Sequence, residues 1–238
     1  QAVAGGNDHL PFQIAIMNPA EKAYQETTKW LFEQFPAYHE KGAAAYNPGL
    51  KNCLELASFF NNPQAELTFV HVGGTNGKGS TSNMLASILK EAGETVGLFT
   101  SPHLFDFTER IRVKGQCIDP TFVVEFCQQV REHTWKIAPS FFEITWIMAL
   151  CYFREKNCSI VVAEVGMGGR LDATNIITPI LNIITNIGLD HTQFLGDTRA
   201  KIAFEKAGII KSGVPVLFGE QDAETQPVFL EQAQLKHA

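Results

Sequence analysis

The sequence lacks the marks of a membrane, nucleic-acid-binding or disulfide-rich protein. No apolar run approaches the roughly 20 residues of a membrane-spanning helix, so we expect no membrane contact. The 19 Lys and Arg are outnumbered by 25 Asp and Glu, for a net charge of −6, which gives no reason to expect nucleic acid as a partner. The five cysteines are an odd number, widely spaced and without a CxxC pair. Free thiols in the core and a cytoplasmic location are therefore expected.

What is present fits an ordinary soluble protein. The chain has 238 residues, of which 45% are hydrophobic and 18% charged, enough for one large domain or two small ones. Residues 1–16 are oddly composed, whereas Met17-Asn18-Pro19 looks like a natural start. We expect residues 1–16 to be an upstream segment and residues 17–238 to form the domain. A genuine N-terminal arm is the alternative.

Buried strands alternate with amphipathic helices along the whole chain. The strand patterns cover residues 67–72, 95–100, 159–165, 180–187 and 214–218. The helix patterns cover residues 19–35, 50–60, 120–135, 141–156, 197–208 and 223–236, with a further helix up to a cap at Gly93 and a loop over residues 41–48. This alternation predicts an α/β fold with a doubly wound, mostly parallel sheet.

A glycine-rich turn follows the first strand. Gly74, Gly77 and Gly79 surround Lys78, and in the helix that follows Met84, Leu85, Ile88 and Leu89 recur at the spacing of one helix face. Such a turn directs N–H groups and the positive end of the helix dipole at one point, where a polyphosphate fits. The strict phosphate-loop pattern fails at Val72 and Gly79, and the dinucleotide pattern fails as well. A plain glycine-rich turn with a surface lysine is the alternative.

The run Gly74-Thr-Asn-Gly-Lys-Gly-Ser-Thr81 resembles the phosphate loop of the Mur-ligase superfamily, and more narrowly that of its folate branch, dihydrofolate synthase and folylpolyglutamate synthase. The run S-P-H-L-F-D-F-T-E-R-I-R-V from Ser101 and the run G-x-G-G-R-L-D-A-T-N ending at Asn175 match signatures of the same branch. The resemblance covers residues 18–238 but only the front part of a family member. It implies a partial, P-loop NTPase-like, ATP-binding domain, with the C-terminal ligase domain outside these residues.

The resemblance assigns functional residues. ATP would be bound by Thr75, Asn76, Gly77, Lys78, Gly79 and Ser80. Two Mg²⁺ ions are implied, with Ser101 and Glu143 as ligands of one and His191 with carbamylated Lys206 around the other. Lys78 and Lys206 would be catalytic. On softness alone an imidazole suits Zn²⁺ better than Mg²⁺.

Each assignment has a simpler structural alternative. Ser101 can merely begin a turn before Pro102, His191 can be structural, and Lys206 can be an exposed lysine near a helix C-terminus. Glu143 lies in the first turn of an apolar helix, where a buried carboxylate needs either the helix dipole or a divalent cation as partner.

Other charged residues are left more open by the sequence. Glu164, at the end of its strand, is typical of a Walker B acid. Arg170 and Asp172 can pair as a salt bridge. Three further charges are expected to be solvated, namely Glu109, Arg110 and Arg112.

The candidate residues follow strand ends, and in open α/β sheets that edge holds the ligands. With the resemblance, this indicates an ATP-dependent ligase that adds L-glutamate to dihydropteroate or to folate polyglutamate tails through an acyl phosphate. A monomer with only small-molecule partners is expected. The alternatives are a Mur-type ligase acting on another acid and an ATP-binding module without activity. A simple P-loop kinase is disfavoured because Lys78 is not followed by Ser or Thr.

Overall fold

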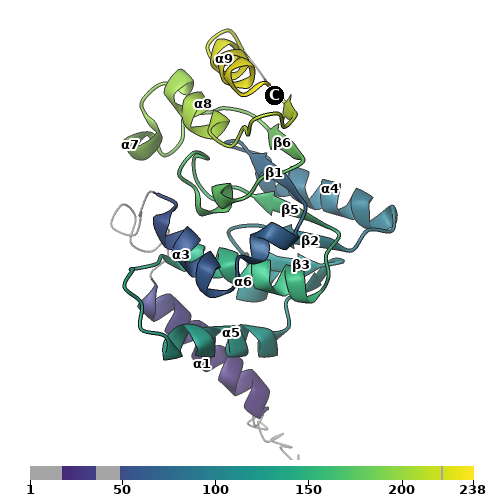
Figure 1. The fold of residues 1–238 in the computed structure, drawn as a ribbon, viewed down its shortest axis with the longest axis vertical. Helices are drawn as coiled ribbons and strands as arrows, with labels where there is room; N and C mark the ends of the chain where they lie inside the picture. Colours follow the sequence, from purple (N-terminus) through teal and green to yellow (C-terminus); the bar gives the residue numbers. More distant parts are fainter. Residues whose placement is uncertain (1–17, 36–48, 221) are drawn as a thin grey trace, which may run out of the picture.

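A seven-stranded sheet forms the centre of the computed structural model, which describes residues 18–35, 49–220 and 222–238 (Figure 1). Its strand order is β4-β3-β2-β5-β1-β6-β7. The strands are β1 Phe69–Gly73, β2 Val96–Phe99, β3 Ile111–Val113, β4 Gln116–Cys117, β5 Ile160–Glu164, β6 Leu181–Ile184 and β7 Val216–Phe218. The upstream segment expected at residues 1–16 and the loop expected at 41–48 lie outside the described residues.

Five of the strands are parallel neighbours. β2, β5, β1, β6 and β7 pair in parallel, which confirms the mostly parallel α/β sheet predicted from the sequence. β3 and β4 add an antiparallel hairpin at the β2 edge, which the sequence patterns did not predict. The carboxyl ends of β1, β2, β5 and β6 therefore meet at one edge of the sheet, where the loops that follow them carry the candidate residues.

The helices cover both faces of this sheet. They are α1 Pro19–Gln34, α3 Lys51–Phe59, α4 Lys78–Glu91, α5 Pro120–Glu132, α6 Phe141–Glu155, α7 Thr192–Leu195, α8 Arg199–Ala207 and α9 Gln226–Lys236, with 3₁₀ turns η2 Pro63–Glu66, η3 Phe107–Arg110 and η4 Ala173–Ile176. α4 lies on one face and α6 on the other, α1 and α5 pack side by side, and α8 and α9 lie beyond β6 (Figure 1).

The apolar helix α6 forms a large part of the core on one face of the sheet. Twelve of its fifteen residues are buried, because α6 packs between the sheet and α3. The Ser140 hydroxyl caps the helix by accepting a hydrogen bond from the Glu143 N–H. The Glu143 carboxylate in turn accepts from the Ser140 N–H, which completes a capping box. The first turn of α6, and with it Glu143, is thus fixed at the edge of the sheet.

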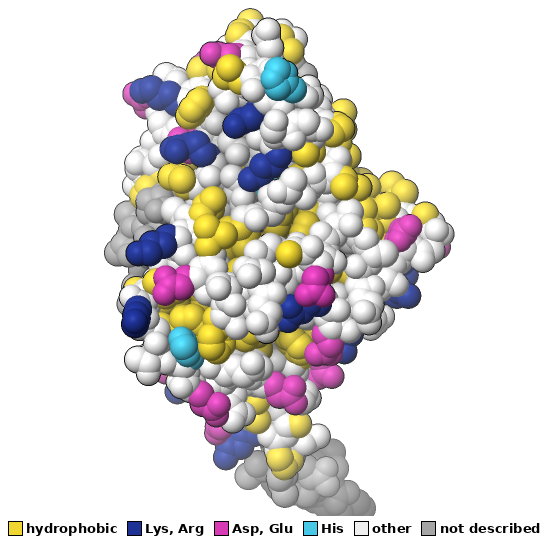
Figure 2. All heavy atoms as spheres, viewed as in Figure 1, with side chains coloured by type: hydrophobic (Ala, Val, Ile, Leu, Met, Phe, Trp, Pro, Cys, Tyr) yellow, Lys and Arg dark blue, Asp and Glu magenta, His cyan; other side chains and the backbone are white. Residues whose placement is uncertain are grey.

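α4 departs from the expected pattern. Leu85 and Leu89 pack on the valines of β1 and β5, but Met84 is 60% and Ile88 66% exposed. Apolar side chains are accordingly visible over α4 (Figure 2). The four residues therefore do not share one buried face, because Met84 and Ile88 lie on the flank of the helix that turns away from the sheet.

The cysteine and membrane expectations can be compared with the same structure. All five cysteines are free thiols, as expected, and four are buried, whereas Cys117 is exposed on the edge strand β4. In the described part of the chain, none of the helices combines the length and the apolar character that crossing a bilayer requires.

Candidate active site

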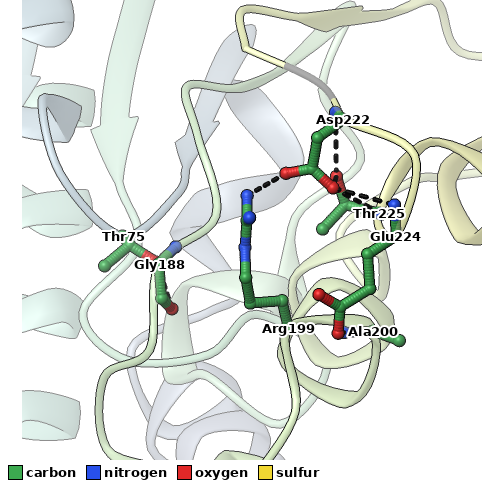
Figure 3. A network of polar contacts seen from close by, with 7 residues as sticks. All are labelled: Thr75, Gly188, Arg199, Ala200, Asp222, Glu224 and Thr225. Carbon is green, nitrogen blue, oxygen red and sulfur yellow. Dashed lines mark hydrogen bonds and ion pairs between the residues drawn. The ribbon is translucent and has the colours of Figure 1, made fainter.

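The glycine-rich turn joins β1 to α4 and is held from one side by the segment after β6. Thr75 N donates to Asn186 O at 2.9 Å, and Asn76 N donates to Asn186 Oδ1 at 2.9 Å. Gly188 N donates to Thr75 Oγ1 at 3.0 Å, a contact visible in Figure 3. The turn is therefore held in place by hydrogen bonds from Asn186 and Gly188.

The glycines of this turn are required by its geometry. Gly77 has φ +78 and precedes the first residue of α4, Lys78. The first N–H groups of a helix have no carbonyl partner within it, and a glycine at the N-cap contributes no side chain to satisfy them. They point outward together with the positive end of the helix dipole, which is the arrangement that binds phosphate.

Glu164 interacts with both Ser101 and Lys78. Its Oε2 accepts the Ser101 N–H at 3.0 Å, and a Cβ on Gly79 would lie 3.6 Å from both of its carboxylate oxygens. Burial raises the pKa of Glu164, while the nearby Lys78 charge opposes that rise. A buried carboxylate at the end of β5, against the phosphate loop, is where a P-loop enzyme orders its metal or water.

Glu143 has one oxygen engaged and one without a partner. Oε2 accepts from Ser140 N at 2.7 Å and from Ser140 Oγ at 2.8 Å. Oε1 is buried, and within the described residues it has no hydrogen-bond partner. Burial raises the pKa of the Glu143 carboxyl group, and the side chains of Ser140 and Asn52 oppose that rise. The capping alternative thus accounts for Oε2, whereas Oε1 still calls for a cation or a water.

Lys206 is buried rather than exposed. Only 4% of it is accessible, and Nζ donates to Gly74 O at 2.7 Å. Burial, and next the Lys78 charge, lower its pKa to about 8. The alternative of a surface lysine at a helix end was therefore wrong, because α8 packs its last turn against the phosphate loop.

His191 lies on the same segment that holds the phosphate loop. It precedes α7 with φ +48, and its Nε2 is 3.6 Å from Asp190 Oδ2. Among the residues that the structure describes, no group of three His, Cys, Asp or Glu side chains is arranged to hold a metal ion. Ser101, Glu143 and His191 thus do not form a closed cage. Mg²⁺ usually keeps several waters and takes phosphate oxygens as ligands, so an open arrangement suits it.

The structure answers one question that the sequence left open and corrects one expectation about charged residues. The salt bridge of Arg170 is with Glu205 of α8, Nη2 to Oε1 at 2.9 Å, rather than the possible pair with Asp172. The expectation that Arg110 is solvated was wrong: Arg110 is 3% exposed and donates from Nε to His103 Nδ1 at 2.7 Å. Burial lowers its pKa to about 10.

Sequence reasoning missed two contributions to this site. Asp172 is a third buried carboxylate, whose charge raises the pKa of Glu143 and Glu164. The segment at 185–188 positions the phosphate loop, yet its T-N-I-G run was interpreted only for His191. For residues 185–188 the signal was polar residues and a glycine directly after the buried strand β6, and for Asp172 it was an acidic residue in the glycine-rich segment that follows β5.

The start of α8 is fixed by a separate polar network (Figure 3). Arg199 reaches from α8 to the Asp222 carboxylate, and Ala200 N donates to Glu224 Oε1 at 3.2 Å. Asp222 also accepts from the backbone of Thr225. Because Arg170 binds the other end of α8, the helix that carries Lys206 is held at both ends.

Comparison with known proteins gives a consistent picture. A family model described as the Mur ligase middle domain matches residues 72–236. The chain is 38% identical over 223 residues to a dihydrofolate synthase/folylpolyglutamate synthase of Bacillus subtilis, covering 91% of this chain and 50% of that protein. It is 43% identical over 151 residues to the Escherichia coli protein of that name, covering 63% and 36%.

Solved structures agree with the fold. A folylpolyglutamate synthase from Thermotoga maritima matches with a TM-score of 0.80 at 38% identity, covering 91% of this chain and 49% of that one. An FPGS-AMPPCP-folate complex matches with a TM-score of 0.81 at 34% identity, covering 90% and 52%. The chain spans about half the length of the B. subtilis relative and of these solved structures.

Proposed function

This chain belongs to the Mur ligase family, and on that basis we propose that it is the nucleotide-binding part of an ATP-dependent ligase that attaches L-glutamate to dihydropteroate, to the glutamate tail of a folate, or to both. The observation that carries the proposal is the meeting of the phosphate loop with Glu164 and Lys206 at one sheet edge, with Lys206 Nζ 2.7 Å from Gly74 O. The relatives named for this activity support the choice of substrates.

The reaction proceeds in two steps. A carboxylate oxygen of the acid attacks the γ-phosphorus of ATP, ADP leaves, and an acyl phosphate forms. The amine of L-glutamate then attacks the acyl carbon, and phosphate leaves from the tetrahedral intermediate as the amine loses a proton. Lys78 and the N–H groups at the start of α4 offset negative charge on the transferred phosphoryl group.

The residues present fit a divalent cation at this edge. Glu143 offers a buried oxygen without a partner in the described chain, and Ser101 lies beside Glu164 through its N–H. Ser101 and Glu143 would hold one Mg²⁺, with His191 and a carbamylated Lys206 near a second. A bound Mg²⁺ supplies charge neutralisation at the phosphates.

The burial of Lys206 supports the proposal that it is carbamylated. A lysine with a pKa of about 8 has a much larger neutral fraction near neutral pH than an exposed lysine. The neutral amine attacks CO₂, a C–N bond forms and a proton is released, which leaves an anionic group in place of an ammonium. Native mass spectrometry of the intact protein, prepared with and without bicarbonate, should show one added CO₂, and Lys206→Met should abolish the addition.

An ADP-release assay with omissions tests the function. The intact protein that carries this chain should release ADP over many turnovers only when the acid and L-glutamate are both present, because the first step alone forms at most one ADP per enzyme molecule. Lys78→Ala should remove most turnover, whereas Lys90→Ala, an exposed lysine of the same helix, should not. Multiple-turnover ADP release without glutamate, or ATP binding without turnover, would contradict the proposal. Turnover only with a peptidoglycan precursor would assign another Mur-type acid substrate.

A further inference from the structure

A buried histidine lies beneath the phosphate loop and has no role in the site described so far. His71 is in the middle of β1, three residues before Gly74, and is fully buried. Its Nε2 is 2.8 Å from Thr174 Oγ1. The same hydroxyl oxygen is 2.5 Å from Asp172 Oδ1, so the three side chains form one continuous buried chain of hydrogen bonds.

The donors in this chain can be assigned by counting hydrogens. A threonine hydroxyl has one hydrogen, and an ionised carboxylate can only accept. Asp172 already accepts the backbone N–H groups of Met167 at 2.9 Å and of Thr174 at 3.0 Å. If the Thr174 hydroxyl also donates to Asp172, its oxygen must accept from His71, so the imidazole carries its proton on Nε2.

The other ring nitrogen fits this assignment. His71 Nδ1 is buried without a hydrogen-bond partner in the described part of the chain, and the same is true of both the amide nitrogen and the amide oxygen of Asn182. Asn182 is the register partner of His71 on the neighbouring strand β6, so with the His71 proton on Nε2 the unprotonated Nδ1 is an acceptor for the nitrogen end of that amide. Burial, and next the Lys211 charge, lower the pKa of His71 to about 3, which keeps the ring neutral.

We propose that His71 is a positioning residue, which donates from Nε2 to Thr174 so that Thr174 donates to Asp172, and that this relay fixes residues 166–175 against the strand that carries the phosphate loop. The inference rests on the proposed ligase function for its catalytic consequence only. Asp172 closes the segment by accepting N–H groups from both of its ends. His71 attaches that closed segment to β1.

The segment matters because it touches the helix that carries Lys206. Arg170 N donates to Glu205 O at 2.8 Å, and Asn175 Nδ2 donates to Gly208 O at 3.1 Å. A Cβ on Gly169 would lie only 2.9 Å from Lys206 O. The relay therefore sets the position of Lys206 relative to the phosphate loop, whereas the loop itself is held from the other side by residues 185–188.

The tautomer of His71 is the direct test. In the intact protein labelled with ¹⁵N at histidine, long-range ¹⁵N–¹H spectra report which ring nitrogen carries the proton, and a His71→Asn sample assigns the signal. We expect the proton on Nε2 and no titration between about pH 6 and pH 9, since the ring is buried and neutral. A proton on Nδ1, or a ring that titrates in this range, would overturn the relay.

Substitutions at Thr174 test the consequence. Thr174→Val removes the relay hydroxyl. Thr145→Val is the matched control, because Thr145 is equally buried and, among the residues that the structure describes, its hydroxyl donates to Phe141 O of its own helix. We expect Thr174→Val to lower kcat about tenfold, the usual cost of a lost buried hydrogen bond. Thr174→Ser should restore activity, and ADP affinity should change less than about twofold in all three.

The outcomes separate this inference from the proposed function. Equal activity of Thr174→Val and Thr145→Val, or a loss confined to ADP affinity, would contradict the positioning role. If Thr174→Val does not fold, failure of Thr174→Ser to match wild type would contradict it as well. A wild-type protein without glutamate-dependent turnover would contradict the ligase function, while the His71 tautomer would still decide whether the relay exists.

Discussion

The shape of the phosphate loop depends on a glycine at position 74. Gly74 has φ +138, and a Cβ there would lie 1.9 Å from Thr185 Oγ1 and 3.1 Å from Thr185 N. A positive φ costs another residue about 1–3 kcal/mol. Moving the Thr185 hydroxyl loses its hydrogen bond to Asn76 O, which is worth about 1 kcal/mol. Since the backbone contact remains, we expect Gly74→Ala to lower the free energy of unfolding by about 3–5 kcal/mol.

Two further variants isolate the cause. Gly93 has φ +96, and a Cβ there would meet no atom of the described residues within 4 Å, so Gly93→Ala should cost only the backbone strain, about 1–2 kcal/mol. Thr185→Ala removes the atom in the shortest contact. The double variant Gly74→Ala/Thr185→Ala should therefore be less destabilised than the sum of the single variants, by about 1–2 kcal/mol.

Urea unfolding measures these differences, and calorimetric titration with ADP measures the effect on the loop. Gly74→Ala should weaken ADP binding, whereas Gly93→Ala should not. Equal losses of stability in Gly74→Ala and Gly93→Ala, or strict additivity with Thr185→Ala, would show that the contact with Thr185 does not shape the loop.

Three other substitutions give distinct results. The folded-state pKa of Lys206 is lowered from 10.5 to about 8, so between these pH values the unfolded chain binds more protons than the folded chain. The free energy of unfolding of the wild type should therefore rise with pH by roughly 3 kcal/mol across that range. Unfolding measured as a function of pH should show no such rise for Lys206→Met. Glu164→Gln removes the charge of a buried carboxyl group whose pKa is raised, so it should raise the melting temperature while lowering turnover. A lower melting temperature would contradict this. Glu143→Gln preserves the capping box and removes a buried charge on a carboxyl whose pKa is also raised, so its melting temperature without metal should be at least that of wild type. The increase that Mg²⁺ gives wild type, and EDTA reverses, should disappear in this variant; an unchanged Mg²⁺ response would favour the cap alone.

Most of the fold could be predicted from the sequence because its strands and helices carry strong periodic patterns. The largely apolar pattern of α6 indicated a buried helix against the sheet, and twelve of its fifteen residues are buried. The β3–β4 hairpin was missed because its strands are three and two residues long, too short for periodicity. Lys114-Gly115, both with positive φ, is the turn signal that would have indicated it.

The site could be predicted in its parts but not in its contacts. The prediction that Lys206 lies near a helix end was correct. Its buried amine, however, donates to Gly74 O, which is 132 residues away in the chain. The sequence left open whether Arg170 pairs with Asp172, which is close to it in the chain, whereas its salt-bridge partner in the structure is Glu205, 35 residues away. Tertiary packing determines which of these side chains are in contact, and a single sequence does not reveal that packing.

Identifying the reaction product is the most direct test of the central claim. The intact protein would be incubated with ATP, Mg²⁺, L-glutamate and either dihydropteroate or tetrahydrofolate, and the acid would be analysed by mass spectrometry. The ligase account predicts an acid heavier by one glutamyl residue, or by several in succession on tetrahydrofolate, with one ADP released for each. An acid of unchanged mass in the presence of ADP formation would contradict it.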